Sequence, residues 1–241
     1  MNAVLVYFVR DMRRWLRGRL NVYSTLIMPA AWLVFVGLAL PTRFTDHYLD
    51  FIAPGILVLT MLSAGMQGGS SLIFDKILGF LNKFLALPSP REAILFGKIL
   101  FITVRGLLQA TVIMLLAVLL GATVFSPVMV LLAYLVLALF GILLSAFSTA
   151  IALYVQDHDA YAAVNSVISM PLFFTSSALM PYDVMPPWLR AIAQVNPVSL
   201  AIDLIRSVAA PPFAWTSLVV LLGITAVMVA CSSLLFRRVT V

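Results

Sequence analysis

The sequence predicts an all-α membrane protein with six transmembrane helices, in one domain that comprises residues 1–241. Hydrophobic residues make up 63% of the chain and charged residues 10%, and the mean hydropathy is +1.11. A water-soluble core does not hold this much apolar surface. The apolar residues form six runs, each near the roughly 20 residues that cross a hydrocarbon core. These runs are residues 22–40, 51–74, 99–120, 127–155, 161–179 and 215–236.

The distribution of basic residues predicts the orientation of the bundle. Six spans place both termini on one side, and 12 of the 15 Lys and Arg residues fall on that side. The other side keeps Arg43, Arg190 and Arg206. Because basic residues collect in cytoplasmic loops, we expect both termini in the cytoplasm. The net charge of +6 then serves orientation and contact with anionic membrane lipids, and we expect no nucleic-acid partner.

Residues 1–19 precede the six-span bundle of residues 22–236 and predict an amphipathic elbow helix. Leu5, Phe8, Met12, Trp15 and Leu16 share one arc at 100° per residue, and four arginines between positions 10 and 17 share the opposite arc. A basic helix of this kind lies in the membrane interface. It could be a plain anchor that sets the topology or could also touch a cytoplasmic partner, and the two are compatible.

The loop over residues 75–98 predicts a short amphipathic helix, a sharp turn at Pro88 and a second helix capped by Ser89 with Pro90 at its first position. A simple connection needs only a few residues, so docking of another protein is favoured over an interfacial helix that lies on lipid. The second inner loop, residues 156–159, is an exposed turn with the same expectation. The residues expected to couple to the partner are Lys76, Phe80, Leu81, Lys83, Phe84, Pro88, Arg91, Asp157 and His158.

Three features within and beyond the spans leave alternatives open. Gly65 and Gly69 have the small-xxx-small spacing, which favours packing within the chain over dimerisation. Arg105 lies about two turns inside its span, where it either snorkels to the headgroups or has a buried partner or a role in the transport path. On the outer side, residues 186–194 predict one short helix. Asn196 caps a second that runs to about residue 209, and the two suggest a re-entrant pair.

The sequence lacks the motifs of an energy-coupling or catalytic site. It contains no G-x-x-x-x-G-K-[ST] phosphate loop, no H-E-x-x-H and no G-x-S-x-G. We therefore expect no catalytic, cofactor or metal site in this chain, and a partner that supplies the energy. The alternatives from other classes are an ion-driven secondary carrier, which needs repeats and buried ionisable groups, and an intramembrane enzyme, which needs a nucleophile paired with a base.

Three stretches resemble the permease subunit of ABC-2 type transporters, in the branch of daunorubicin-resistance and nodulation-type exporters. Residues 48–55 are similar to the family's Y-x-x-F-x-x-P-G, and residues 79–98 resemble its coupling loop, L-x-x-L-P-x-x-R…G-K. Residues 180–206 resemble its signature P-x-x-x-x-P-x-W-L…N-P…D-x-x-R. The motif residues are Pro54, Gly55, Pro181, Pro186, Trp188, Asn196, Pro197, Asp203 and Arg206.

The resemblance implies a transport subunit without an ATPase site of its own, in the plasma (inner) membrane of a prokaryote. It would act as a homodimer or as half of a heterodimer, with ATP and Mg²⁺ bound by a separate ATP-binding-cassette subunit. The few charges in the spans favour a lipophilic or amphipathic cargo such as a drug, a lipid or a lipid-linked compound. A polysaccharide or glycolipid exporter of the same superfamily stays open. The expected path residues are Met61, Met66, Gln67, Asn165, Met170, Phe173 and Phe174.

Overall fold

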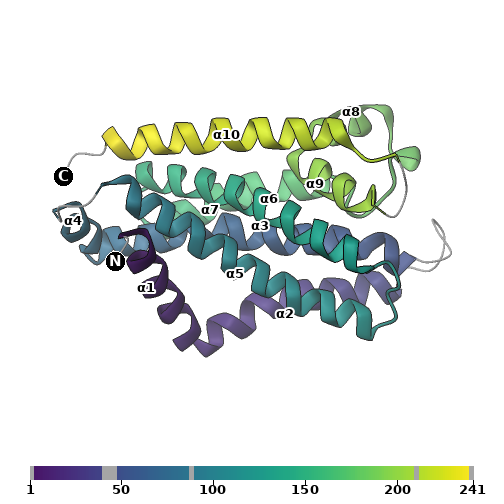
Figure 1. Ribbon diagram of the computed structural model, residues 1–241, viewed down its shortest axis with the longest axis horizontal. Helices are drawn as coiled ribbons and strands as arrows, with labels where there is room; N and C mark the ends of the chain where they lie inside the picture. The colour runs from purple at the N-terminus through teal and green to yellow at the C-terminus, as the bar shows by residue number, and fades with distance from the viewer. Residues whose placement is uncertain (1–2, 40–47, 87–89, 209–211, 239–241) are drawn as a thin grey trace.

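The computed structural model describes residues 3–39, 48–86, 90–208 and 212–238, and within these ranges all regular structure is helical (Figure 1). The sequence-based prediction of an all-α protein is therefore confirmed. The helices are α1 (Ala3–Arg17), α2 (Arg19–Ala39), α3 (Tyr48–Ile77), α4 (Phe80–Leu85), α5 (Glu92–Leu119), α6 (Pro127–Tyr154), α7 (His158–Phe174), η1 (Tyr182–Val184), α8 (Pro187–Val195), α9 (Pro197–Arg206) and α10 (Trp215–Arg238).

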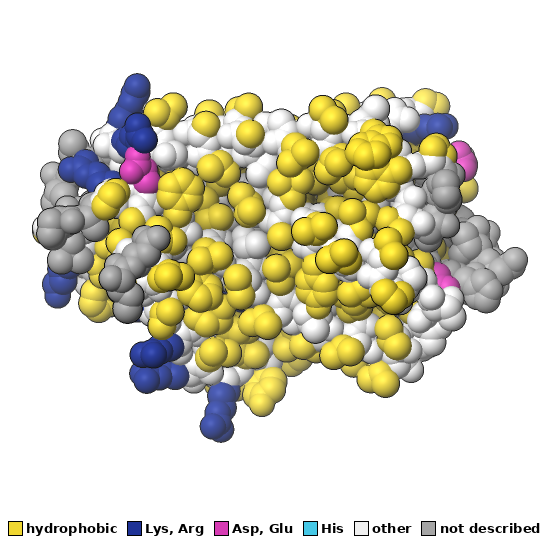
Figure 2. Space-filling model, viewed as in Figure 1, with side chains coloured by type: hydrophobic (Ala, Val, Ile, Leu, Met, Phe, Trp, Pro, Cys, Tyr) yellow, Lys and Arg dark blue, Asp and Glu magenta, His cyan; other side chains and the backbone are white. Residues whose placement is uncertain are grey.

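Four helices in the described part of the chain are long and apolar enough to cross a membrane: α3, α5, α6 and α10. The remaining two predicted spans fall on α2, whose apolar stretch is Val22–Phe35, and on α7, which has 17 residues. Charge is segregated along the long axis of the molecule. Lys and Arg gather toward the end that holds α4 and both termini, while hydrophobic side chains cover the middle of the visible face (Figures 1 and 2). This pattern is typical of a membrane protein with one basic face.

Helix α3 is the centre of the bundle, because it packs against α2, α5, α6, α7 and α9. Small residues allow these close approaches. A Cβ at Gly65 would lie 2.5 Å from the Cβ of Leu144 on α6, and the hydroxyl of Ser148 donates a 2.8 Å hydrogen bond to the Gly65 carbonyl. Gly69 faces Tyr161 and the Ser148 backbone. The small-xxx-small pair thus serves packing within the chain.

The connection between α3 and α5 lies at the end that holds both termini, which is called the inner end after the predicted orientation, the opposite end being the outer end. The predicted short amphipathic helix is present there but is broken at Gly79. Gly79 has a φ of 70°, a left-handed conformation that breaks the helix, so that Ile77 ends α3 and Phe80 begins α4. Helix α5 begins at Glu92, two residues after the predicted start. The predicted turn at Pro88 and the Ser89 cap lie outside the described residues.

The outer end confirms the predicted pair of short helices, α8 and α9. The Asn196 side chain caps α9 by accepting a 2.9 Å hydrogen bond from the Val198 amide, and Pro197 takes the first helical position. The Asn196 amide also donates to the carbonyl of Leu172 at 2.8 Å, which ties the cap to α7. Helix α9 ends at Arg206 rather than near residue 209, and the amide of its C-cap residue Ser207 donates a hydrogen bond to the Asp203 carbonyl.

Candidate functional site

The predicted apolar face of α4 is divided between an inward and an outward part. Leu81 is buried in a small core with Tyr7 of α1 and Ile94 of α5. The Phe84 ring lies edge-on to Tyr7 with centroids 5.1 Å apart, and the Arg10 guanidinium lies 4.5 Å above it. Phe80 is 41% exposed, so the exposed surface of α4 centres on this ring and on the exposed Lys83 beside it.

Three of the other predicted coupling residues, Lys76, Asp157 and His158, have partners inside the chain. The Lys76 ammonium donates hydrogen bonds of 3.1, 2.9 and 2.7 Å to the carbonyls of Ala152, Leu153 and Val155. It therefore satisfies the carbonyl end of α6 and complements its dipole.

The second inner turn, residues 156–159, is also held by contacts within the chain. Asp157 caps α7 by accepting a 2.7 Å bond from the Ala160 amide, and the His158 ring packs 5.1 Å from Phe74. Arg91 is half-buried at the start of α5. These contacts show how the residues of the inner surface are held within the chain. The contact of these residues with a partner protein stays a prediction.

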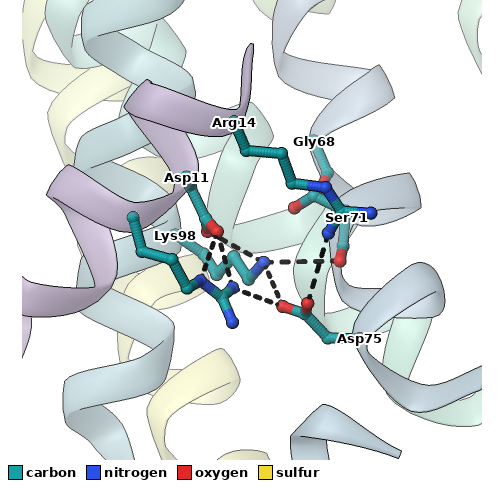
Figure 3. A network of polar contacts seen from close by, with 7 residues as sticks. Asp11, Arg14, Gly68, Ser71, Asp75 and Lys98 are labelled. Carbon is teal, nitrogen blue, oxygen red and sulfur yellow. Dashed lines mark hydrogen bonds and ion pairs between the residues drawn. The ribbon is translucent and has the colours of Figure 1, made fainter. Parts of the chain in front are cut away.

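A buried ionic cluster of Arg10, Asp11, Asp75 and Lys98 lies directly beneath α1 (Figure 3). The Lys98 side chain, 1% exposed, places its ammonium 2.9 Å from Asp11 and 2.6 Å from Asp75. Arg10 bridges the same two carboxylates, with hydrogen bonds of 2.8 Å to Asp11 and 2.7 Å to Asp75. Two cations thus face two anions, and the cluster joins α1 to α3 and α5.

The two carboxylates of this cluster favour the charged form of Arg10. Burial works against the charged guanidinium of Arg10, but the neighbouring carboxylates of Asp11 and Asp75 and their hydrogen bonds outweigh it, so the pKa of Arg10 lies above its ordinary value. Arg14 adds a longer contact of 3.6 Å to Asp75 from the exposed side. Sequence analysis missed this cluster, although two signals were present: one acid inside the basic stretch of α1 and one lysine inside an apolar run.

Next to the cluster, a pocket of about 600 Å³ lies between α1, α2, α3, α5 and α7. Two of the predicted path residues, Gln67 and Asn165, line it. Met61 and Met66 lie in the hydrophobic core instead, where the Met61 sulfur occupies the space above Gly106 and Gly141. On α7, Phe173 is buried, whereas Met170 and Phe174 are exposed. The pocket wall is more polar than the predicted apolar path.

Arg105 also lines this pocket. Its side chain is buried and its Nη2 donates a 3.1 Å hydrogen bond to the Gln67 side chain. The guanidinium carbon lies 5.7 Å from the Trp15 ring centroid. Arg105 is therefore buried within the bundle and contacts the exposed Gln67 and the half-buried Trp15.

At the opposite end of the bundle, the family-motif residues form an outer lock around Arg206. Its guanidinium donates to the carbonyls of Ser177 at 2.9 Å and Phe51 at 2.8 Å, and it lies 3.8 Å from the Phe51 ring centroid. The Tyr48 hydroxyl donates to the carbonyl of Leu179 at 3.2 Å. The lock joins the first turn of α3 to α9 and to the segment after α7.

Asp203 extends the outer lock through hydroxyl donors. It accepts hydrogen bonds from Tyr182 at 2.7 Å and Ser177 at 3.2 Å. Burial, assisted by the nearby Asp203 carboxylate, raises the pKa of Tyr182 to about 12, so the phenol keeps the proton that it donates.

The remaining motif residues shape the backbone of the outer end. A Cβ at Gly55 would lie 2.8 Å from the carbonyl oxygen of Ala178, so glycine is needed for this close approach, and the neighbouring Pro54 is buried inside α3. Pro181 and Pro186 flank η1 and α8, and Trp188 is exposed on α8. The outer motif residues are therefore mainly structural.

Comparison with known proteins gives consistent matches. Residues 2–210 match the family model described as ABC-2 type transporter. A protein of Cyanophora paradoxa named as the transport permease ycf38 is 37% identical over 79% of this chain and 68% of its own length. The daunorubicin resistance ABC transporter permease protein DrrB1 of Streptomyces coeruleorubidus is 25% identical over 83% of this chain and 72% of its own length. A protein of Escherichia coli K12 named as the multidrug ABC transporter permease YbhR is 25% identical over 79% of this chain, which spans about half of that relative's length (53%).

Proposed function

Because this chain belongs to the ABC-2 type transporter family, we propose that it is the permease subunit of an exporter that uses ATP hydrolysed by a separate subunit. The cargo would be a lipophilic or amphipathic compound moved outward. The observation that carries the proposal is α4, a short helix at the basic end that exposes Phe80 and Lys83 and is braced from behind by α1. ATP and Mg²⁺ would be bound by the partner, and this chain would not be an enzyme by itself.

The proposed topology has six spans, formed by α2, α3, α5, α6, α7 and α10. The gathering of Lys and Arg at the end with both termini and α4 supports a cytoplasmic position for that end, in the plasma (inner) membrane of a prokaryote (Figure 2). Helices α8 and α9 then lie on the outer side as the re-entrant pair.

The topology predicts opposite labelling of two exposed positions. In a Cys231→Ser background, Val184→Cys near the outer helices should react in intact cells with a membrane-impermeant maleimide, and Asn82→Cys on α4 should not. Permeabilised cells provide the control, because both cysteines should then react. Labelling of position 82 in intact cells would contradict the six-span topology.

We propose that two permeases pair through the surface that contains α7. This helix packs mainly on α3, and Val167, Met170 and Phe174 remain exposed on it. The pocket that Gln67 and Asn165 line opens beside the same helix. A second permease, either the same chain or a related one, would cover this surface and complete a path between the two subunits.

Coupling through α4 predicts different effects for two neighbouring aromatic residues. Phe80→Ala should weaken recovery of the ATPase subunit about fivefold or more, as expected when an anchor worth about 1 kcal/mol is truncated, without lowering permease stability. Phe84→Ala should lower stability, because its ring packs on Tyr7 and Arg10.

Phe35→Ala is a matched control for Phe80→Ala, since Phe35 is also exposed and belongs to α2, a helix that Figure 1 shows apart from α4. The measurement is co-purification of the two subunits at matched permease levels, together with thermal unfolding in detergent. Equal recovery of the ATPase with Phe80→Ala and Phe35→Ala would refute the role of α4.

A further inference from the structure

Arg105 is a buried cation without a counter-charge in the described part of the chain. Its side chain is 9% exposed, and no ion pair among the described residues includes it. Its Nη2 is bonded to the neutral Gln67, and its Nε is buried without a hydrogen-bond partner among the described residues. The nearby cations differ, because Lys98 and Arg10 each contact two carboxylates.

A buried guanidinium without a counter-charge raises the free energy of the folded protein, because burial removes its hydration and no anionic group compensates for the loss. Buried charges within membrane proteins usually face a partner or a cavity that serves function. Arg105 faces a cavity: it lines the pocket of about 600 Å³ between α1, α2, α3, α5 and α7. This is a volume typical of small-molecule sites.

The wall around Arg105 offers donors and positive charge. Trp15 lines the pocket, and its indole Nε1 is a second buried donor without a partner in the described residues. Arg14 contributes a further cation, and Asn165 an amide. Asp11 is the one carboxylate among the lining residues that the structure describes, and it is already paired with Lys98 and Arg10. The pocket therefore has an excess of positive charge.

We propose that this pocket binds the anionic head group of an amphiphilic substrate, a phosphate, sulfate or carboxylate group, with Arg105 as its counter-ion. The apolar part of the substrate would lie against apolar side chains that line the same pocket, such as Phe74, Phe101 and Ala162. The inference rests on the proposed export function and names its substrate class. A planar guanidinium with free N–H groups is well suited to bind phosphate or carboxylate oxygens.

Binding to the permease alone tests the head-group specificity. The probes are two fluorescent lipids with the same acyl chains, NBD-phosphatidic acid and NBD-phosphatidylcholine, titrated into the purified chain in a neutral detergent. Phosphatidic acid should bind more tightly, and Arg105→Gln should weaken its binding about tenfold or more through loss of a charge-assisted contact, without changing binding of phosphatidylcholine. Arg238→Gln, an exposed arginine at the end of α10, is the matched control and should leave both affinities unchanged.

Several results would overturn the inference. Equal binding of phosphatidic acid by Arg105→Gln and by the unmodified chain would do so. Displacement of the lipid by inorganic phosphate, at concentrations that fill a site for free anions but do not compete with a bound lipid, would also overturn it. If Arg105→Gln does not fold, Arg105→Lys keeps the charge and should retain most of the binding, whereas an equal loss with Lys would refute the role of charge.

A second measurement separates a substrate from a resident lipid and from the export function itself. In vesicles that contain the complete permease–ATPase complex, ATP should drive NBD-phosphatidic acid across the bilayer faster than NBD-phosphatidylcholine. Binding without such transport, in a complex that hydrolyses ATP, would refute the substrate role and leave the exporter proposal intact. Failure to assemble with any ATPase would refute the exporter proposal, while the binding result would still stand on its own.

Discussion

Replacing Lys98 with methionine is expected to lower the free energy of unfolding by about 3–5 kcal/mol, the usual cost of removing one partner from a buried ion pair. The Lys98 ammonium is the group that contacts both Asp11 and Asp75 from within the bundle. Its loss leaves two buried carboxylates that share Arg10. Methionine has a similar length and fills the same space, so the effect reports charge and not a cavity.

Thermal unfolding of the purified chain in detergent measures this loss, with Arg238→Met as the control for removal of an exposed cation. Because α1 is attached to α3 and α5 through the cluster, proteolysis within α1 should also become faster in Lys98→Met. Combining Lys98→Met with Asp11→Asn removes one of the orphaned carboxylates and should recover part of the stability. An unfolding temperature equal to that of Arg238→Met would show that the cluster contributes little.

Replacing Arg206 with methionine is expected to cost about 3 kcal/mol, because it removes two hydrogen bonds from a charged donor and leaves acceptors buried. The two acceptors are the carbonyls of Ser177 and Phe51, and Asp203 loses its nearest positive neighbour. Phe51 also loses the guanidinium that lies over its ring. The outer lock should therefore open while the inner cluster stays intact.

Arg190→Met on α8 is the matched control, since Arg190 is an exposed arginine at the same end. Hydrogen exchange should become faster in α9 and in the first turn of α3, and remain unchanged in α1. Faster exchange at both ends of the bundle would contradict a local role. If Arg206→Met and Arg190→Met unfold at the same temperature, the lock does not stabilise the outer end.

Hydropathy and helix-capping residues predicted the elements that depend only on residues close together in the sequence. The apolar runs located α3, α5, α6 and α10 to within a few residues, because a span requires a fixed length of apolar residues. The exception is the inner end of α5, which begins about two turns before its apolar run. The Asn196 cap with Pro197 was predictable for the same reason, since donor and acceptor are two residues apart. A break at Gly79 was not predicted, because glycine is also tolerated within helices.

The polar contacts that build the inner site depend on tertiary packing and could not be read from periodicity. The helical pattern placed Arg10 and three other arginines on the arc opposite the apolar residues. In the structure Asp11, the residue after Arg10, is directed into the bundle and forms an ion pair with Lys98. The pattern also showed that α4 has an apolar side, but not that Leu81 and Phe84 are covered by the chain's own α1. For Arg105 the sequence left snorkelling and burial open, and its contact with Gln67, 38 residues away, could not be predicted from the local pattern.

The ionic cluster beneath α1 also has a consequence for the order in which the protein matures. Arg10 precedes its partner Asp75 by 65 residues, and Lys98 follows Asp75 by a further 23. During synthesis α1 is therefore made long before Asp75 and Lys98, and until then it lies at the membrane surface as an amphipathic helix in which Arg10 can pair with Asp11. Its final attachment comes after α3 and α5 have entered the bilayer, so α1 is fixed in place only by helices that follow it in the sequence.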